Sequence, residues 1–134
     1  MKDKILYRST VPVQGYFVPA IVAEPASKDV ELATTELFGP VLAMSKCQGL
    51  EEAVQMANDS PFGLSTAVFT RDLDQAMTFA HQIDAGLVRI NGDTTGVDLH
   101  APFGGFKSSS SGSREQGTVA KDFFTQWKTI QINP

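Results

Sequence analysis

The segment from residue 41 to residue 91 alternates short apolar runs with amphipathic helical patterns, and this alternation constrains the fold more than any other feature. Apolar runs at 41–44, 65–70 and 87–91 predict strands. The segments between them carry apolar residues at helical spacing, namely Leu50, Ala53, Val54 and Ala57, then Leu73, Ala76, Met77, Ala80 and Ile83. This order is typical of parallel strands joined by crossover helices. We therefore predict an α/β fold with a parallel sheet and crossover helices.

Residues at the ends of the two helices support their predicted bounds. Glu51 and Glu52 lie in the first turn of the first helix, where acidic side chains complement the helix dipole. Asp72 precedes the second helix and is of a residue type that caps helix N-termini. Pro61 lies in a turn-forming run after the first helix, and Gly86 is suited to the C-terminal stop of the second.

The flanks of this region differ in character. Residues 1–35 combine short apolar patches with several prolines, which predicts loops and short edge strands. Residues 118–134 predict a short helix and then a last strand over 126–132. Residues 92–117 are rich in Gly and Ser, and composition alone leaves a flexible linker open. A structureless stretch of about 20 residues in a compact domain is usually functional, however, and the aromatic and charged residues here favour a functional loop.

Charge and length exclude several classes of protein. The 134 residues suffice for one domain and carry 11 Lys and Arg against 15 Asp and Glu, a net charge of -4 with scattered charges. Nucleic-acid binding needs a basic stripe, and a bilayer span needs about 20 apolar residues; the sequence has neither. The N-terminus lacks a signal-peptide pattern, and Cys47 is the single cysteine. We expect a cytoplasmic protein without nucleic-acid or membrane partners.

Seven short motifs follow one another along the chain. They are GYFV at 15–18, ELFGPV at 36–41, ANDSPFGL at 57–64, VFTRD at 68–72, GLVRIN at 86–91, PFGGFK at 102–107 and REQG at 114–117. In this order they resemble the carboxy-terminal part of the NAD(P)-dependent aldehyde dehydrogenase superfamily. The run at 95–100 leading into 102–107 is similar to the 2-oxoglutarate semialdehyde dehydrogenase branch, although Ser109 and Ser110 replace the family's serine-glycine pair.

The resemblance implies the C-terminal portion of an aldehyde dehydrogenase catalytic domain plus an oligomerisation strand. Residues 1–35 would be a lead-in, 36–117 the α/β core with the substrate loop, and 118–134 the C-terminal helix and oligomerisation strand. The family's nucleophilic cysteine, its water-activating glutamate and its Gly-rich cofactor segment belong to parts of the family sequence that precede this chain. We therefore expect no catalytic residue in these 134 residues, no activity of the chain alone, and a parent enzyme that oxidises an aldehyde to a carboxylate with NAD or NADP.

Two residues are implied to bind the cofactor. In the family, the carboxylate at the position of Glu36 accepts hydrogen bonds from the nicotinamide ribose hydroxyls, and an ionised carboxylate is a strong acceptor. The ring of Phe38 would pack against the nicotinamide. Sequence alone leaves the plainer alternatives open, a surface glutamate and an ordinary core phenylalanine.

Two further residues are implied to bind the aldehyde. Phe103 matches a position that lines the family's substrate tunnel, and it could equally anchor its loop to the core. Asn91 ends a strand, where parallel-sheet enzymes place functional side chains, and it could equally be a strand-terminating asparagine. Arg89 and His100 are weaker candidates for a substrate carboxylate, whereas Lys107 and Arg114 are expected to tie down the loop.

Cys47 is predicted to be no nucleophile, since it follows an apolar strand and matches no catalytic position of the family. No metal-ligand set is predicted. The alternative to a piece of an enzyme is a non-catalytic truncated homologue acting as an interaction module. Both hypotheses expect a homo-oligomer through the strand over 126–132, because an open strand edge is prone to pairing with another chain.

Overall fold

The computed structural model describes residues 2–134, so Met1, the first residue of the predicted lead-in, lies outside the described residues. The chain divides after Gln48 into two compact units. Both contain helical segments and short strands, and the strand pairs include parallel and antiparallel ones. The predicted α/β class is confirmed. The predicted division at 35/36 and 117/118 follows the roles that the family resemblance implies, and this division stays a prediction.

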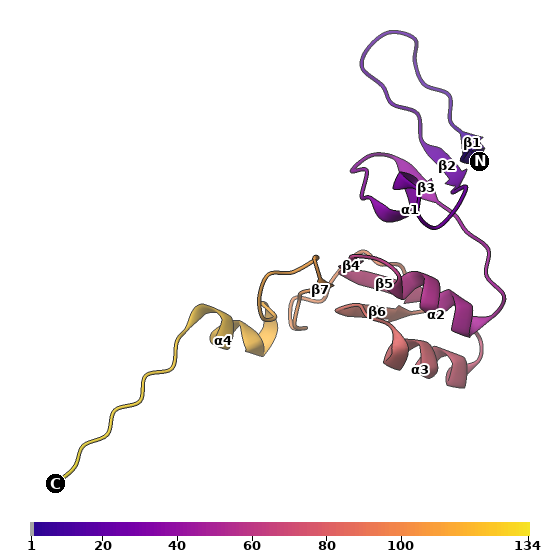
Figure 1. The fold of residues 1–134 in the computed structure, drawn as a ribbon. Coiled ribbons are helices and arrows are strands. Elements are labelled where there is room, and N and C mark those ends of the chain that lie inside the picture. The colour runs from indigo at the N-terminus through magenta and orange to yellow at the C-terminus, as the bar shows by residue number, and fades with distance from the viewer. Residues whose placement is uncertain (1) are drawn as a thin grey trace. The chain divides into compact units, whose positions relative to one another are not determined.

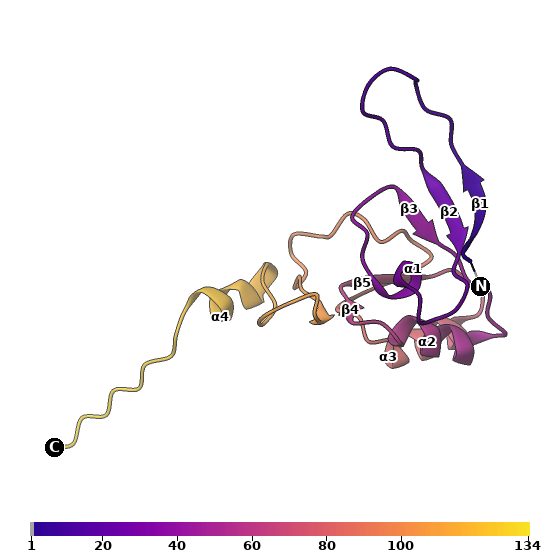
Figure 2. The same cartoon turned by 45° about the horizontal axis from the view of Figure 1, so that its top comes forward.

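The first unit is a three-stranded sheet with one short helix (Figure 1). Its elements are β1 (Lys4–Arg8), β2 (Ile21–Glu24), α1 (Glu31–Thr34) and β3 (Val41–Ala43). The strand order is β1-β2-β3, with β1 antiparallel to β2 and β2 parallel to β3. Figure 2 shows the three strands side by side, with the long loop that joins β1 to β2.

The strand predicted at 41–44 exists, but its partner is not the one that the alternation indicated. It pairs in parallel with β2, with Ile21 opposite Val41 and Ala23 opposite Ala43. The prediction of one parallel series running from 41 through 65 to 87 is therefore wrong in the described residues. An apolar period identifies an element type, whereas pairing also depends on non-local contacts, and here Ala23 is buried in the middle of the sheet.

The second unit contains the predicted crossover region. Its elements are α2 (Leu50–Asn58), β4 (Phe62–Gly63), β5 (Ser65–Val68), α3 (Leu73–Gln82), β6 (Leu87–Ile90), β7 (Phe106–Lys107), a 3₁₀ turn (Gly117–Val119) and α4 (Ala120–Phe124). Strands β5 and β6 are parallel and joined through α3. Both predicted helices and the later two predicted strands are confirmed.

One cluster of buried side chains joins the two helices to the parallel strands. Helices α2 and α3 lie beside the β5–β6 pair (Figure 1). The cluster consists of Val54, Phe79, Ile83 and Ala85, with Leu50, Val68 and Val88 packed against it. Asp72 caps α3 as predicted, since its carboxylate accepts hydrogen bonds from the backbone N–H groups of Asp74 and Gln75 at 2.9 and 3.2 Å.

The predicted role of Gly86 as a helix stop is wrong. Helix α3 ends at Gln82, and Ile83 is its C-cap residue. A side chain at Gly86 would overlap the carbonyl oxygen of Gly104, so glycine is required here because the loop backbone lies directly against it. This close approach also shows that residues near Gly104 are packed against the unit, which the linker interpretation did not predict.

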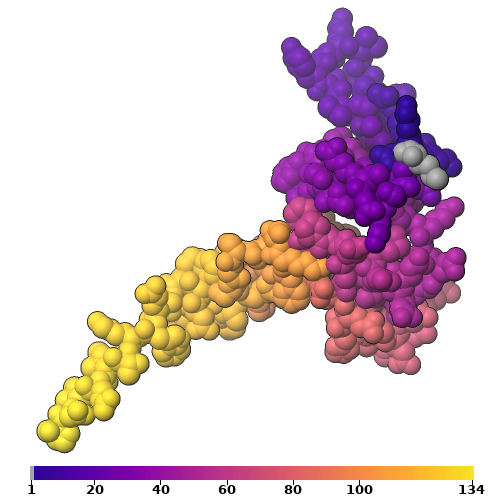
Figure 3. All heavy atoms as spheres, in the orientation of Figure 1, coloured from indigo at the N-terminus to yellow at the C-terminus, as the bar shows by residue number. Residues whose placement is uncertain are grey.

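The C-terminal residues carry a short helix and then extended backbone. Helix α4 confirms the predicted helix, and its C-cap residue Thr125 is extended, with φ -129° and ψ 164°. Residues 126–132 form no strand among the described residues, and the pairing of this segment with another chain stays a prediction. The yellow end of the chain in Figure 3 is a narrow run of atoms. No helix within residues 2–134 has the length and apolar content needed to cross a membrane.

Candidate functional site

Glu36 and Phe38 lie on the loop that joins α1 to β3, and both ends of this loop are held by backbone hydrogen bonds. At its start, the Thr35 N–H donates to the Glu31 carbonyl at 2.9 Å. At its end, the Pro40 carbonyl accepts from the Ile21 N–H of β2 at 2.9 Å. The loop is therefore anchored to a helix on one side and to the sheet on the other.

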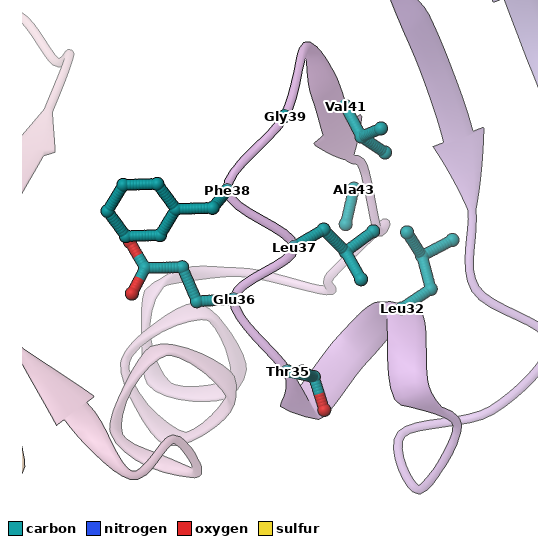
Figure 4. A pocket seen from close by; sticks show the side chains of 8 residues that line it. All are labelled: Leu32, Thr35, Glu36, Leu37, Phe38, Gly39, Val41 and Ala43. Atoms are coloured by element: carbon teal, nitrogen blue, oxygen red, sulfur yellow. The ribbon is translucent and has the colours of Figure 1, made fainter.

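The side chains of Glu36 and Phe38 project to the same side of this loop (Figure 4). Leu37 between them points to the opposite side, toward Leu32 and Ala43 (Figure 4). Phe38 has a positive φ of 51° and is 93% exposed, so its ring is not a core residue of this unit. A pocket of about 420 Å³ lies at the loop, lined by Leu32, Thr35, Glu36, Leu37, Phe38, Gly39, Val41 and Ala43.

Phe103 lies in the second unit at the edge of a different pocket. This pocket has a volume of about 550 Å³ and is lined by Leu64, Phe103, Gly104, residues 108–113, Glu115 and Phe123. The backbone of Phe103 forms a two-way bridge with Glu115, with N···O distances of 2.6 and 2.9 Å. Phe103 is half-buried, so it both anchors the loop and contributes to the pocket wall.

Arg114 and two serines hold the turn that follows Phe103. The Arg114 guanidinium donates to the Gly105 carbonyl at 2.6 Å and lies over the Phe106 ring, 4.8 Å from its centre. The hydroxyl oxygens of Ser109 and Ser110 accept from the N–H groups of Gly63 and Gly105, at 3.0 and 2.7 Å. The prediction that Arg114 ties down the loop is confirmed.

Asn91 immediately follows β6, and both ends of its side-chain amide are bound to the backbone of Thr70. Its Oδ1 accepts from the Thr70 N–H and its Nδ2 donates to the Thr70 carbonyl, both at 2.9 Å. Asn91 also has a positive φ of 54°. It lines neither pocket described above. Thr70 was not among the residues predicted from the sequence. Its hydroxyl accepts a hydrogen bond from the Asp72 N–H at the start of α3, and this position before a helix was the local feature that could have drawn attention to it.

The side chains of Arg89 and His100 both contact residues of the loop that follows β6. The Arg89 guanidinium donates to the carbonyls of Thr95 and Gly96. The His100 side chain is 97% exposed and contacts Asp98 at 3.1 Å. The backbone N–H of His100, and next its ring, lower the pKa of Asp98. The role of these two residues toward a substrate carboxylate stays a prediction.

Asp93 is bound in the same loop. Its carboxylate accepts from the Thr95 hydroxyl at 2.6 Å and from the Thr95 N–H at 2.9 Å. These two hydrogen bonds, the hydroxyl first, hold the pKa of Asp93 below its ordinary value. Loop residues 93–95 therefore fold onto an ionised carboxylate.

Cys47 lies after β3 and is exposed. It lines neither pocket described above. No group of His, Cys, Asp and Glu within residues 2–134 is placed to hold a metal ion. The absence of a catalytic residue from this chain stays a prediction.

The comparison with protein families decides the identity of the chain. Residues 4–130 match the aldehyde dehydrogenase family. The chain belongs to this family. The family predicted from the sequence is therefore confirmed, and the chain corresponds to a portion of an aldehyde dehydrogenase.

Two curated aldehyde dehydrogenases show how much of the family the chain represents. It is 49% identical to the alpha-ketoglutaric semialdehyde dehydrogenase of Bacillus subtilis (strain 168), over 90% of this chain and 25% of that enzyme. It is 43% identical to the alpha-ketoglutarate semialdehyde dehydrogenase of Haloferax volcanii, over 87% of this chain and 24% of that enzyme. The chain thus spans about a quarter of these relatives, and the predicted branch is supported by both.

Solved aldehyde dehydrogenases also share the fold. A salicylaldehyde dehydrogenase from Pseudomonas putida G7, complexed with salicylaldehyde, matches with a TM-score of 0.86 and 35% identity over 98% of this chain and 27% of that one. A Mycobacterium tuberculosis aldehyde dehydrogenase complexed with NAD+ matches with a TM-score of 0.81 and 33% identity, over 92% of this chain and 26% of that one.

Proposed function

We propose that this chain supplies the nicotinamide-ribose carboxylate and the substrate loop of an aldehyde dehydrogenase that oxidises an aldehyde to a carboxylate with NAD or NADP. The observation that carries the proposal is the loop between α1 and β3. Glu36 and Phe38 project together from a segment anchored at both ends (Figure 4).

The chemistry of these two side chains fits a nicotinamide nucleoside. The carboxylate oxygens of Glu36 can accept hydrogen bonds, and ribose hydroxyls can donate them. Phe38 offers an exposed aromatic face beside it, suited to stacking on a flat ring. NAD or NADP, when bound, supplies the hydride acceptor. Glu36 and Phe38 orient it.

The substrate side of the proposal rests on Phe103 and Asn91. Phe103 contributes an apolar wall to the larger pocket. Asn91 is held by two hydrogen bonds to the Thr70 backbone, and it directs the chain into the loop at 92–117. We propose a 2-oxo acid semialdehyde as substrate, supported by the two semialdehyde dehydrogenases above.

A segment exchange tests this function. The corresponding quarter of the Bacillus subtilis relative is replaced by these 134 residues, and formation of reduced cofactor is followed with alpha-ketoglutaric semialdehyde and with salicylaldehyde. We expect turnover, with preference for the semialdehyde. A folded exchange enzyme that oxidises neither aldehyde contradicts the proposal. Preference for salicylaldehyde contradicts the substrate class alone.

The isolated 134 residues provide the second arm of the test. We expect no turnover with either aldehyde, because the nucleophile is predicted to lie in another part of the parent enzyme. Turnover that survives Cys47→Ser would show that the catalytic machinery lies elsewhere in this chain. Turnover abolished by Cys47→Ser would identify Cys47 as a nucleophile.

The second candidate function is a non-catalytic interaction module, and the C-terminal residues favour it. Trp127, Ile130 and Ile132 are 95%, 75% and 88% exposed, and the segment is extended. Such a segment is suited to pairing with a strand of another chain. An oligomer through this segment, in a cytoplasmic protein, is part of both proposals. Turnover by the exchange enzyme distinguishes them.

A further inference from the structure

The ends of α2 and α3 meet at the side chain of Asn58. Its Nδ2 donates to the carbonyl of Gln82, the last residue of α3, at 2.8 Å. Its Oδ1 accepts from the Asp84 N–H, also at 2.8 Å. The last carbonyls of a helix have no partner within the helix, so Asn58 satisfies one of them from the neighbouring helix.

Lys107 reaches this junction from β7. Its ammonium donates to the Asn58 carbonyl at 2.7 Å, at the C-terminus of α2, and lies 3.5 Å from the Asp84 carboxylate. A cation is favoured at a helix C-terminus, where the helix dipole is negative. The Lys107 side chain is only 25% exposed, which makes this contact less accessible to solvent than an ordinary surface pair.

The backbone around Lys107 places the same residue at the end of the turn that carries Phe103. Lys107 pairs with Phe62 across the β4–β7 ladder, and the Ser108 N–H donates to the Pro61 carbonyl at 3.0 Å. Lys107 has a positive φ of 50°, a conformation that is uncommon for a lysine. Its side chain and its backbone therefore both fix the loop relative to α2.

We propose that Asn58 and Lys107 form a clasp that positions the substrate loop of this aldehyde dehydrogenase, with Lys107 as a positioning residue that sets the affinity for the aldehyde. The clasp consists of Asn58, Gln82, Asp84 and Lys107. The inference rests on the proposed function for its effect on the substrate, whereas its effect on the loop itself is independent of that function.

Amide hydrogen exchange of the 134-residue chain tests the clasp directly. In Lys107→Met, we expect the Ser108 amide to exchange roughly three- to tenfold faster, the effect of losing one hydrogen bond. The Ala76 amide inside α3 should be unchanged, and Lys121→Met on α4 is the matched control. An unchanged Ser108 amide in Lys107→Met overturns the proposal.

Chemical rescue separates the ammonium from the bulk of the side chain. Lys107→Cys is made in a Cys47→Ser chain and alkylated with 2-bromoethylamine, which restores an amine at nearly the original length. We expect slow exchange of the Ser108 amide to return. If exchange stays fast after complete alkylation, the ammonium is not what holds the loop, and the proposal is wrong.

The exchange enzyme tests the effect on substrate. Lys107→Met should raise the KM for the semialdehyde several-fold and leave the KM for NAD or NADP unchanged. Equal KM values for the aldehyde in both enzymes overturn the positioning role. An exchange enzyme that is inactive without any substitution contradicts the proposed function instead, and amide exchange then still decides whether the clasp holds the loop.

Discussion

Four residues other than glycine have φ angles in the left-handed region among residues 2–134, and they are Phe38, Asn91, Lys107 and Gln116. This region is sterically unfavourable for a residue with a Cβ atom, so such residues persist only where their surroundings hold them. At Asn91 the holding contacts are the two hydrogen bonds to Thr70. At Lys107 they are the contacts of the clasp.

Two substitutions at Asn91 distinguish the stability contributed by its side-chain hydrogen bonds from the cost of its positive φ. Asn91→Gly keeps the positive φ free of steric cost and loses the amide, so we expect a loss of about 1 kcal/mol in the free energy of unfolding. Asn91→Ala loses the amide and must also adopt a positive φ, which costs about 1 kcal/mol more. Denaturant unfolding measures both. A glycine variant as unstable as the alanine variant would show that the backbone is not strained at Asn91.

The hydrogen bonds that lower the pKa of Asp93 predict a pH dependence for residues 93–95 of the loop. Because the folded state lowers this pKa below the ordinary value of 3.8, ionisation stabilises the loop, and this contribution is present above pH 3.8. It is lost as the pH falls through the lowered pKa. NMR titration of the Asp93 carboxyl carbon should give a pKa below 3.8, and Thr95→Val, which removes the hydroxyl donor, should raise it. A value in Thr95→Val equal to that of the unsubstituted chain would contradict this account.

Elements with a local signal could be predicted from the sequence. Helices α2 and α3 follow apolar residues at helical spacing, and Asp72 marks the start of α3. Strand pairings with non-local causes could not. Strand β3 was predicted as an element, but its pairing with β2 was not, and the two-residue strands β4 and β7 depend on each other although they lie far apart in the sequence. The predicted cofactor residues came from a motif match, whereas the contacts of Asn91 and Lys107 became visible only in the folded chain.

The close approach between Gly86 and Gly104 limits which residues can stand where β6 packs against the following loop. A Cβ atom at position 86 would overlap the backbone of Gly104, so Gly86→Ala must push β6 and the loop apart. We expect a loss of about 1–3 kcal/mol, typical of overpacking. Gly92→Ala is the matched control, because a Cβ atom there would meet no heavy atom within 4 Å and its φ is not positive. Equal stability of the two variants, measured by denaturant unfolding, would be evidence against this packing.

At the scale of the whole molecule, the chain buries few apolar side chains and spans about a quarter of its relatives. The pair β5–β6 is parallel, and parallel sheets are normally covered on both faces. The apolar side chains of Trp127, Ile130 and Ile132 are exposed. These features are expected of a segment whose surface is completed by other parts of an enzyme or by a second copy.

The C-terminal segment is predicted to make the chain self-associate. We expect light scattering of the 134-residue chain to report a mass that rises with concentration, because the extended segment over 126–132 can pair with another chain. Ile130→Lys should shift the chain toward the monomer, since a charge blunts an open edge, while Thr78→Lys, which adds the same charge on the exposed side of α3, serves as the control. A monomer at every concentration would contradict the predicted oligomer.

The role of Glu36 is tested by the cofactor affinity of the exchange enzyme carrying Glu36→Gln. Loss of a charged acceptor should raise the KM for NAD or NADP by roughly tenfold to a hundredfold, with little change in the KM for the aldehyde. Glu31→Gln on α1, in the same unit, is the control and should leave both KM values unchanged. If Glu36→Gln has the same cofactor KM and the same kcat as Glu31→Gln, Glu36 does not bind the cofactor and the proposed function of this loop is wrong.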